Sequence, residues 1–398
     1  MKIEAIAKID MSHNNGATAR LIDFCEDLAA RNRVRMWLQR TRLPPVLGST
    51  PGLEVRLLPA PTTPERSEVE KALRTIVYEV VFSLQLAAAF LREGRSDVIY
   101  LREVATLAPG LIGVLFRVPV FVEIDGFPYR NARRQTGVLQ RFRAEALRWQ
   151  ARLCAGIVTF SDGQREVMLQ DYGVAEQRVL TIPNGADLDR FLPSPRDAAV
   201  ETLGLDRDLE YVVWAGSYRP NQDLPLLLQA FARLHERRPG ARLLLIAAHV
   251  AELEELSRKA GVEPWVLVRH VEHAKVPVYM AAASVCVATL VDTVGIRTNA
   301  VAPLKLFEYL ACGRPTVTAD VPFLRFVEER GLGSLYRPGD AESLAAALER
   351  MLSLPGGERD ALGAHVRSYV EANHGWSMLN ARTEEFLRER AMARGGGG

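Results

Sequence analysis

The sequence predicts an α/β protein built from two doubly wound parallel sheets. Short β-branched runs alternate with stretches of helical spacing in both halves of the chain, a pattern typical of strand–helix–strand units with helices on both faces of a sheet. At 398 residues the chain exceeds what one hydrophobic core usually supports, so two domains are expected. A cluster of Pro and Gly in VLTIPNGADLDRFLPSP, residues 179–195, interrupts the alternation and predicts the linker.

In the first half, the predicted strands are the runs IEAIAKI, RVRMWLQ, LEVRLLP, DVIYLR, VPVFVEI and GIVTFS. Helices are expected in ARLIDFCEDLAAR, where apolar residues recur at helical spacing, and at 68–92, 104–116 and 136–152. The longest apolar stretch, residues 75–91, contains Glu79 and Gln85 and falls short of a clean transmembrane span. A buried helix is therefore predicted there. The amino-terminal MKIEAIAKID predicts a first strand and not a signal peptide.

In the second half, the predicted strands are YVVWAG, ARLLLIA, VLVRHV, SVCVATL and RPTVTA. The helices expected around them are 224–237, 251–260, 276–283, 304–311, 341–353, 357–372 and about 376–391. These patterns predict a first domain over 1–188 and a second over 189–373. A last helix at about 374–392 is expected to pack back on the first domain, and residues 393–398 are expected to form a flexible tail.

Composition and motifs argue against several functional classes. The formal net charge is +2 with 25% charged residues, which gives no support for a nucleic-acid partner. No GxGxxG or GxxxxGK[ST] follows a predicted strand, so a nicotinamide enzyme or a P-loop NTPase is poorly supported. Neither an HExxH nor a Cys/His cluster of zinc spacing occurs, and no metal site is predicted. The cysteines Cys25, Cys154, Cys286 and Cys312 lie far apart in apolar settings and are predicted to be reduced core residues of a cytoplasmic protein.

Several segments taken together resemble the family 4 glycosyltransferases, whose GT-B fold has two facing Rossmann-like domains with a cleft between them. They are VLTIPNGADLDRF, YVVWAGSYRPNQDLPLLLQAFARL, KVPVYMAAASVCVATL, APLKLFEYLACGRPTV, PGDAESLAAALERML and HGWSMLNARTEEFL. The likeness covers most of residues 90–390. It implies a retaining glycosyltransferase of the hexosyltransferase type. Such an enzyme moves a sugar from a nucleotide-diphosphate sugar, such as a UDP- or GDP-sugar, to an acceptor hydroxyl, and needs neither a metal nor another cofactor.

The resemblance places the donor site in APLKLFEYLACGRPTV, residues 302–317. Glu308 stands at the position where the family holds the ribose hydroxyls, and a carboxylate can accept hydrogen bonds from both hydroxyls of a diol. Lys305 lies one turn earlier on the same face and can reach the diphosphate, aided by the N–H groups of the helix start. By themselves the two residues would also fit a solvated ion pair on a surface helix. The donor-binding candidates are Glu308, Lys305, Arg219, Gly216, Ser217, Asn299, Ala300, Pro303 and Leu304.

The sequence departs from the family pattern at two places. Many members carry a first glutamate that contacts the donor sugar, and Ala300 stands at its position with Asn299 beside it as a neutral substitute. The family also has an arginine and a lysine on the diphosphate where this chain has Ser217 and Gln222. Arg219 is the nearest cation and the candidate for that contact, although a solvated turn residue would have the same sequence context.

Two loops of the first half are the candidates for the acceptor side. SHNNGAT, residues 12–18, follows the first strand and supplies Asn14, Asn15 and Gly16 for sugar hydroxyls or phosphate. A simple turn with a helix cap would fit the same letters. Arg102, at the end of DVIYLR, completes the acceptor-binding candidates.

The catalytic candidates are Asp125, Glu123, Lys305 and Arg219. Glu123 and Asp125 end the strand in VFVEIDGFPYR, where alternation places both on one side of the carboxyl edge. Asp125 is the best protein base for the acceptor hydroxyl, and the leaving phosphate itself is the alternative. Glu123 would equally serve a structural role by capping loop N–H groups. Lys305 and Arg219 are expected to stabilise the charge on the leaving diphosphate.

Residues 129–153 are rich in arginine. This composition fits either a solvated helix face or contact with an anionic leaflet, so a peripheral position at the inner membrane face stands beside the cytoplasm as the expected location. The acceptor class stays open between a glycan, a lipid-linked compound and a small molecule. Two other functions also stay open: a partner subunit that binds sugar nucleotides without catalysis, motivated by Ala300, and a GT-B nucleotide-sugar epimerase.

Overall fold

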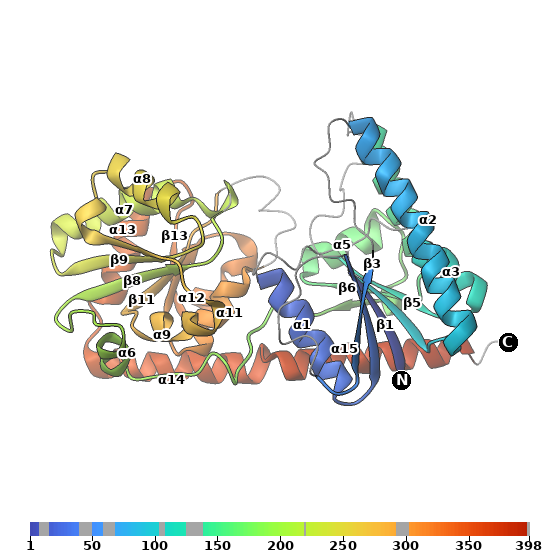
Figure 1. The fold of residues 1–398 in the computed structure, drawn as a ribbon. Helices are drawn as coiled ribbons and strands as arrows, with labels where there is room; N and C mark the ends of the chain where they lie inside the picture. The colour runs from blue at the N-terminus through green and yellow to red at the C-terminus, as the bar shows by residue number, and fades with distance from the viewer. Residues whose placement is uncertain are drawn as a thin grey trace. The chain divides into compact units, whose positions relative to one another are not determined.

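The computed structural model describes residues 1–7, 16–39, 50–58, 68–102, 108–124, 138–218, 220–291 and 302–395 (Figure 1). By its internal contacts the chain divides into two compact units. The first comprises Met1–Pro183 together with Ser377–Gly398, and the second comprises Asn184–Trp376. Each unit has its own parallel sheet and its own apolar core.

The first unit is built on a seven-stranded sheet with the strand order β3-β2-β1-β4-β5-β6-β7, in which every neighbouring pair is parallel. The strands are β1 (Lys2–Ala7), β2 (Arg33–Gln39), β3 (Leu53–Leu58), β4 (Val98–Arg102), β5 (Val120–Glu123), β6 (Gly156–Thr159) and β7 (Val179–Thr181). The order reverses between β1 and β4, which makes this place the topological switch point of a doubly wound sheet.

Helices cover both faces of this sheet. They are α1 (Gly16–Ala29), α2 (Glu68–Glu93), α3 (Ala108–Phe116), α4 (Val138–Leu153), α5 (Asp162–Gln170) and α15 (Trp376–Gly395). Right-handed crossovers place α2 to α5 on one face and α1 on the other. Leu86, Ile112 and Leu147 bring α2, α3 and α4 into one buried cluster on their face. On the α1 face, the ring of Phe386 from α15 packs edge-on against Phe121 at 5.9 Å between centroids.

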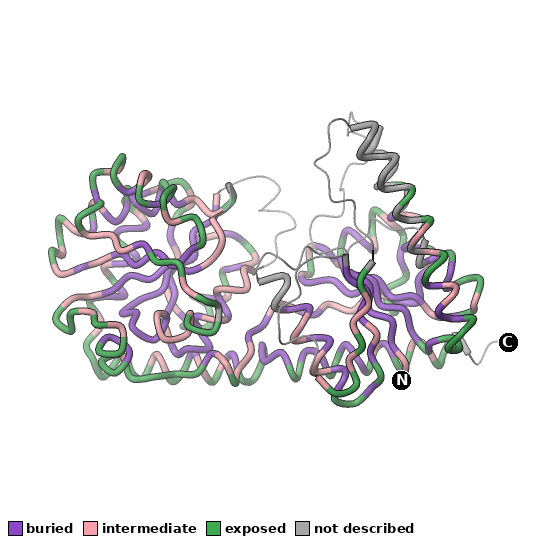
Figure 2. The backbone as a smooth tube through the Cα atoms, viewed as in Figure 1, coloured by how far each residue is buried: buried purple, intermediate pink, exposed green. Residues whose placement is uncertain are grey.

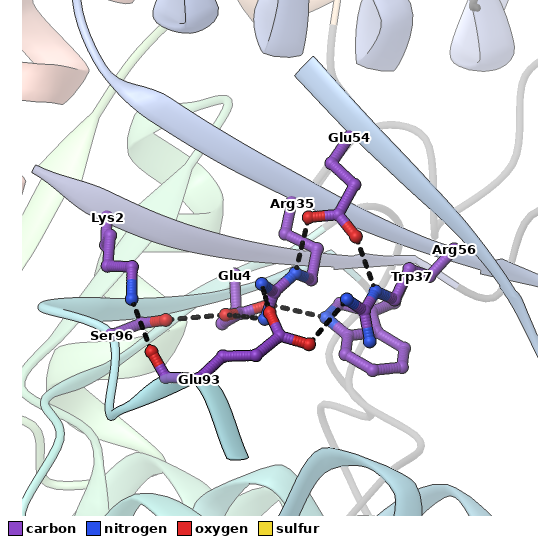
Figure 3. A network of polar contacts seen from close by, with 8 residues as sticks. All are labelled: Lys2, Glu4, Arg35, Trp37, Glu54, Arg56, Glu93 and Ser96. Carbon is purple, nitrogen blue, oxygen red and sulfur yellow. Dashed lines mark hydrogen bonds and ion pairs between the residues drawn. The ribbon is translucent and has the colours of Figure 1, made fainter. Parts of the chain in front are cut away.

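A network of polar side chains joins the first three strands at the amino-terminal edge (Figure 3). The buried carboxylate of Glu4 in β1 accepts hydrogen bonds from Arg35 and Trp37 in β2 and from Ser96. Arg35 also pairs with Glu93 at the end of α2. The remaining members are Lys2, Glu54 and Arg56. Because every charge drawn here has a partner, the network fixes β1, β2, β3 and α2 relative to one another.

The second unit is built on a six-stranded parallel sheet with the order β10-β9-β8-β11-β12-β13. The strands are β8 (Glu210–Ala215), β9 (Ala241–Ile246), β10 (Val266–Arg269), β11 (Val285–Ala288), β12 (Thr316–Ala319) and β13 (Gly333–Tyr336). Its switch point lies between β8 and β11, and ligands of open α/β sheets bind at the carboxyl ends of the strands at such a point.

The helices of the second unit are α6 (Arg196–Thr202), α7 (Leu224–Arg237), α8 (Val250–Lys259), α9 (Val276–Ala281), α11 (Leu304–Ala311), α12 (Phe326–Glu329), α13 (Ala341–Leu352) and α14 (Gly356–Asn373). The start of α7 shows why the sequence folds this way. Asp223 caps the helix by accepting a hydrogen bond from the backbone N–H of Leu226. Leu224, Leu227 and Phe231 then recur on one buried face. This face packs on the sheet while α7 lies beside α13 and α11 beside α14.

These two sheets confirm the predicted class of two doubly wound, Rossmann-like units. The predicted helices at 68–92, 224–237 and 304–311 correspond to α2, α7 and α11. Two short edge strands, β7 and β13, were not predicted. VLT lies in the segment interpreted as a linker, and GSLY opens with two residues of low β-propensity. The four cysteines are buried and form no disulfide, as predicted.

The prediction of a buried helix over residues 75–91 is wrong for one of its faces. Leu86 and Phe90 are buried, but Val77, Leu84 and Leu91 are exposed, and Figure 2 shows exposed segments along α2 beside buried ones. The reason is that α2 has only one face toward the sheet, while its apolar residues occupy more than one face. Among the described residues, no helix is both long enough and apolar enough to cross a bilayer.

The edge strand β13 depends on a glycine. A Cβ at Gly333 would lie 1.9 Å from the carbonyl oxygen of Thr316 in β12, so Gly333→Ala must push the two backbones apart. We expect the variant to lose about 1–3 kcal/mol of unfolding free energy, the usual cost of overpacking, measured by urea denaturation. Gly357→Ala in α14, where a Cβ meets nothing within 4 Å, is the matched control and should be neutral or slightly stabilising. Equal stability of both variants would contradict this packing.

Candidate functional site

Tyr309 of α11 is bonded to the carboxyl end of β8. Its buried hydroxyl accepts a hydrogen bond from the backbone N–H of Ala215 at 2.8 Å and donates one to the carbonyl of the same residue at 3.2 Å. Burial raises the pKa of this phenol well above its ordinary value, so the hydroxyl keeps its proton and both bonds. The start of α11 is thereby held at the switch point of the second sheet.

The small-residue end of α11 is a glycine cap. Gly313 has φ of +69°, and its N–H donates to the carbonyl of Leu310 at 2.9 Å while the N–H of Arg314 donates to that of Tyr309 at 3.0 Å. This is the paired hydrogen-bond pattern that closes a helix with a residue in the left-handed region. The sequence CGRP after the helix thus stops α11 and turns the chain into β12.

Two further segments hold the start of α11. The side-chain amide of Asn184 donates to the carbonyl of Ala302 at 2.9 Å, just before the helix. The carbonyl of Asn184 lies 2.9 Å from Nδ1 of His374, whose ring stacks on Phe307 at 4.2 Å between centroids. Burial lowers the pKa of His374. The PNG and HGW segments of the sequence therefore help to position this helix.

Lys305 lies in the first turn of α11 with its ammonium group half-buried over the end of β8. Nζ donates a hydrogen bond to Oε1 of Gln222 at 2.7 Å and lies 3.8 Å from the ring centroid of Trp214. A Cβ at Gly216 would come within 2.8 Å of Nζ, so a larger residue there would displace the end of the lysine side chain. Burial lowers the pKa of Lys305 to about 7, and the charge of Glu308 opposes this shift.

This environment of Lys305 would favour an anion beside its ammonium group. Its hydrogen-bond acceptor is a neutral amide oxygen, and the Trp214 ring adds a cation–π contact. An anionic group beside Nζ would offset the cost of desolvation and restore the full positive charge. The helix start at Pro303 and Leu304 adds backbone N–H groups with the same preference.

The structure thus brings Gly216, Lys305 and Glu308 to one edge of the sheet. Glu308 follows Lys305 by one helical turn and is half-buried, and Ser217 follows Gly216 directly after β8. The predicted donor-binding residues Arg219, Asn299 and Ala300 lie outside the described residues.

The first unit has a buried polar cluster at the carboxyl ends of β4 and β5. Oε1 of Glu123 lies 3.3 Å from Nε of Arg102, and its Oε2 lies 3.5 Å from Nη2 of Arg20. The hydroxyl of Tyr100 donates to the same carboxylate, and burial raises the pKa of this phenol well above its ordinary value. The side chains of Arg20, Arg102 and Glu123 are only 2–4% exposed, so this ion-paired cluster is buried away from solvent.

These partners of Glu123 are side chains, whereas the structural alternative predicted for this carboxylate was capping of loop N–H groups. That alternative and the catalytic role both stay predictions. Gly16 is the first residue of α1. The other residues predicted for this side, Asn14, Asn15 and Asp125, lie outside the described residues. Within the described part of the chain, no group of His, Cys, Asp and Glu could hold a metal ion.

The sequence did not predict three contacts of the site. They are the ring of Trp214 beside Lys305, the hydrogen bond from Lys305 to Gln222, and the two hydrogen bonds between Tyr309 and Ala215. Trp214 stands in the apolar run YVVWAG, where an aromatic residue cannot be told from an ordinary core residue. Gln222 was noted because it occupies a position where the resembling family has a lysine. This substitution was the signal available in the sequence. A lysine at position 222 could not accept a hydrogen bond from Lys305, whereas the amide oxygen of Gln222 can.

Comparison with known proteins gives partial matches in sequence. The chain is 28% identical over 243 residues to D-inositol 3-phosphate glycosyltransferase 2 of Catenulispora acidiphila, covering 58% of this chain and 55% of that protein. It is 30% identical over 257 residues to D-inositol 3-phosphate glycosyltransferase of Actinosynnema mirum, covering 60% of each. The chain thus spans about half the length of the curated relatives it matches.

Solved structures share the fold along nearly the whole chain. Sucrose-phosphate synthase of Thermosynechococcus elongatus superposes with a TM-score of 0.77 at 21% identity, covering 99% of this chain and all of that one. HepE of Anabaena, solved in complex with UDP-glucose, superposes with a TM-score of 0.73 at 17% identity, covering 98% and 100%.

Two family models match the chain in turn. The description "Glycosyltransferase Family 4" fits residues 14–190, and "Glycosyl transferases group 1" fits residues 210–354. Together they reach into both doubly wound units and contain β8, α11 and the Lys305 site. The chain therefore contains domains of the family 4 and group 1 glycosyltransferases, arranged in the GT-B fold.

Proposed function

We propose that this chain is a retaining glycosyltransferase that uses a nucleotide-diphosphate sugar, with its donor site at the start of α11. The observation that carries the proposal is the half-buried Lys305, hydrogen-bonded to a neutral amide and with a pKa of about 7, at the switch point of a doubly wound sheet. One turn later on the same helix, Glu308 offers a carboxylate for the ribose hydroxyls.

The proposed roles follow from the charges of the reaction. Breaking the bond between the anomeric carbon and the diphosphate develops negative charge on the leaving phosphate. Lys305 and the N–H groups at the start of α11 stabilise that charge, and Arg219 is the proposed second cation. The acceptor hydroxyl attacks the face that the leaving group vacates. Its proton passes to the leaving phosphate oxygen or to Asp125, and Glu123, held by Arg20 and Arg102, supports that loop.

The comparisons suggest which substrates to try first. A solved structure of the same fold holds UDP-glucose, which favours UDP-glucose as the first donor. Two relatives in sequence are named D-inositol 3-phosphate glycosyltransferases, so a phosphorylated cyclitol is the first acceptor to try, ahead of a glycan or a lipid-linked compound.

The second candidate is a sugar-nucleotide-binding subunit without turnover. The observation that favours it is Ala300, which replaces an acidic residue that contacts the donor sugar in many members. An epimerase of the same fold is the third candidate, and it would release an altered free sugar.

One experiment separates the three. UDP-, GDP-, ADP- and TDP-sugars are screened by thermal shift, since a ligand of the native state raises its apparent stability. Each binder is then incubated in radiolabelled form with and without acceptor. Acceptor-dependent transfer of label is the expected result. A thermal shift without turnover would identify the binding subunit, and a labelled free sugar of altered stereochemistry would identify the epimerase. Absence of any shift would overturn the donor site.

Glu308 and Lys305 are expected to act on different parts of the donor. Glu308→Ala should weaken a nucleoside and its diphosphate together, by about 1–3 kcal/mol for lost charged hydrogen bonds. Lys305→Met should weaken the diphosphate by a similar amount and leave the nucleoside unchanged, because the ammonium is proposed to contact phosphate. Titration calorimetry with both ligands measures the difference.

The matched control for this pair is Glu328→Ala in α12, which removes a carboxylate outside the proposed site. It should bind both ligands as the unaltered protein does. Equal losses of nucleoside and diphosphate affinity in Lys305→Met would refute the phosphate contact, and unchanged affinity in folded Glu308→Ala would remove α11 from the donor site.

Binding of the diphosphate should depend on pH. The free protein holds Lys305 with a pKa of about 7, and a bound diphosphate raises that value, so binding above pH 7 takes up a proton. The affinity should therefore fall as pH rises above 7, by up to about tenfold per unit. Calorimetry near pH 8 in buffers of different ionisation enthalpy counts the protons. Lys305→Met should abolish the uptake, and a pH-independent affinity of the unaltered protein would contradict the assignment.

A further inference from the structure

Helix α3 ends on an arginine in a position that usually belongs to glycine. The N–H of Val118 donates to the carbonyl of Gly113 at 2.8 Å, and the N–H of Arg117 donates to that of Val114 at 3.2 Å. This pair of hydrogen bonds closes a helix around one residue in the left-handed region, most often a glycine. Here that residue is Arg117, with φ of +53°. The arginine therefore takes a backbone conformation that glycine would adopt at lower cost.

Other helices of this chain are followed by glycine at the corresponding turn. Gly94 after α2, Gly261 after α8 and Gly313 after α11 have φ of +79°, +70° and +69°. Among the described residues, Arg117 and Asp223 are the two residues other than glycine with positive φ, and Asp223 caps the start of α7. Strained backbone of this kind is found where a side chain has a function. The strain therefore points to a use for the Arg117 side chain.

Close packing of α3 on β5 fixes the backbone of this turn. A Cβ at Gly113 would lie 2.2 Å from the side chain of Val120 in β5 and 2.8 Å from the carbonyl oxygen of Val118. Glycine at position 113 thus lets the last turn of α3 approach the start of the strand. Arg117 is thereby held at the amino-terminal edge of the first sheet. Glu123 stands at the other end of the same strand.

Arg117 lines a cavity of about 680 Å³ at this edge, together with Arg95, which precedes β4, and Arg388 of α15. Arg95 and Arg117 are exposed, and neither forms an ion pair or a side-chain hydrogen bond with a described residue. Arg388 is paired with Glu384 at 3.0 Å. The volume lies within the range of small-molecule sites, so the cavity has room for a ligand beside two unpaired cations.

The charge of the lining favours a phosphate group. Three guanidinium groups stand against the single carboxylate of Asp97, which leaves an excess of two positive charges. Oδ2 of Asp97 accepts a hydrogen bond from the backbone N–H of Lys2 at 2.8 Å, so this oxygen is bonded to β1. A phosphate monoester carries a charge of about −1.5 to −2 at pH 7, and guanidinium groups bind it through paired hydrogen bonds. A carboxylate ligand would neutralise only one of the two charges.

Apolar side chains form much of the remaining lining. They are Val114, Val118, Pro119, Ala391 and Met392. Val114 is 54% exposed and Met392 is 68% exposed, so both would lose contact with water when the apolar part of a ligand packs on them. The lining therefore favours an organic phosphate over inorganic phosphate.

We propose that this cavity binds a soluble phosphate monoester with an apolar substituent. Arg95 and Arg117 bind the phosphate, and Val114 and Met392 contact the substituent. The cavity is formed entirely by the first unit, at the opposite edge of its sheet from Glu123, so it is a ligand site separate from both polar sites described above. The proposal does not rest on the proposed transferase activity. It also lies outside the arginine-rich segment 129–153, of which residues 129–137 are not among the described residues.

Titration calorimetry of the full chain tests the site with three probes: phenyl phosphate, inorganic phosphate and benzoate. We expect phenyl phosphate to bind, and the other two to bind more weakly because one lacks the apolar ring and the other lacks the second charge. Arg95→Gln and Arg117→Gly should each weaken phenyl phosphate by about tenfold, the usual effect of losing a charged hydrogen-bond pair.

Arg117→Gly also separates a binding role from a structural one. Glycine relieves the left-handed strain, so the melting temperature of the unliganded variant should rise while its affinity for phenyl phosphate falls. Arg117→Lys keeps the charge without the planar fork, and its affinity should lie between those of the glycine variant and the unaltered protein. A lower melting temperature in Arg117→Gly would overturn the argument from strain.

Two variants serve as matched controls. Arg350→Gln removes an exposed arginine of α13 in the second unit, and Lys305→Met removes the cation of the proposed donor site. Both should retain the phenyl phosphate binding that Arg95→Gln and Arg117→Gly weaken. Loss of this binding in Lys305→Met would assign the probe to the donor site and overturn the proposal. So would equal affinity in all variants, no binding to the unaltered protein, or binding to phosphatidic acid vesicles without any to phenyl phosphate.

Discussion

The bond pair between Tyr309 and Ala215 is the constraint on which the rest of the candidate site depends. The phenol of Tyr309 accepts a hydrogen bond from the N–H of Ala215 and donates one to its carbonyl, as a neighbouring backbone residue would. It therefore fixes how far the first turn of α11 lies from the sheet. Lys305 stands one turn before Tyr309, so the same contact decides that its ammonium group is over Trp214 and next to Gly216 instead of in water.

Holding Lys305 there costs stability in the free protein, as its lowered pKa records. The ring of Trp214 and the amide of Gln222 offset part of that cost. A second lysine at position 222 would have added repulsion, while a carboxylate would have formed an ion pair and competed with an anionic ligand. The glutamine holds the lysine in place and leaves its positive charge available to an anion.

Much of this site could be predicted from the sequence because its signals are local. The KLFEYLA run with a glycine after it gives α11 and its end, and the spacing of Lys305 and Glu308 puts both on one face. The rest depends on contacts between distant segments. Trp214 under Lys305, Tyr309 on Ala215 and the three partners of Glu123 are all products of the strand order, which residue type does not encode. The prediction of a buried helix over residues 75–91 was wrong for another reason. Helical periodicity indicates that a helix has an apolar face, but it does not indicate which element, if any, covers that face.

Each unit holds a charged side chain at the carboxyl edge of its sheet, and the two charges have different kinds of partner. At the carboxyl edge of the first sheet, Arg20, Arg102 and Tyr100 surround Glu123, so a buried carboxylate has cationic partners within the protein. At the corresponding edge of the second sheet, Lys305 has a neutral acceptor and an aromatic face. A satisfied charge gives a rigid edge, whereas a cation with a lowered pKa gains most from an incoming anion. An incoming anion would therefore gain more binding free energy at the second edge than at the first, where the charge already has partners within the protein.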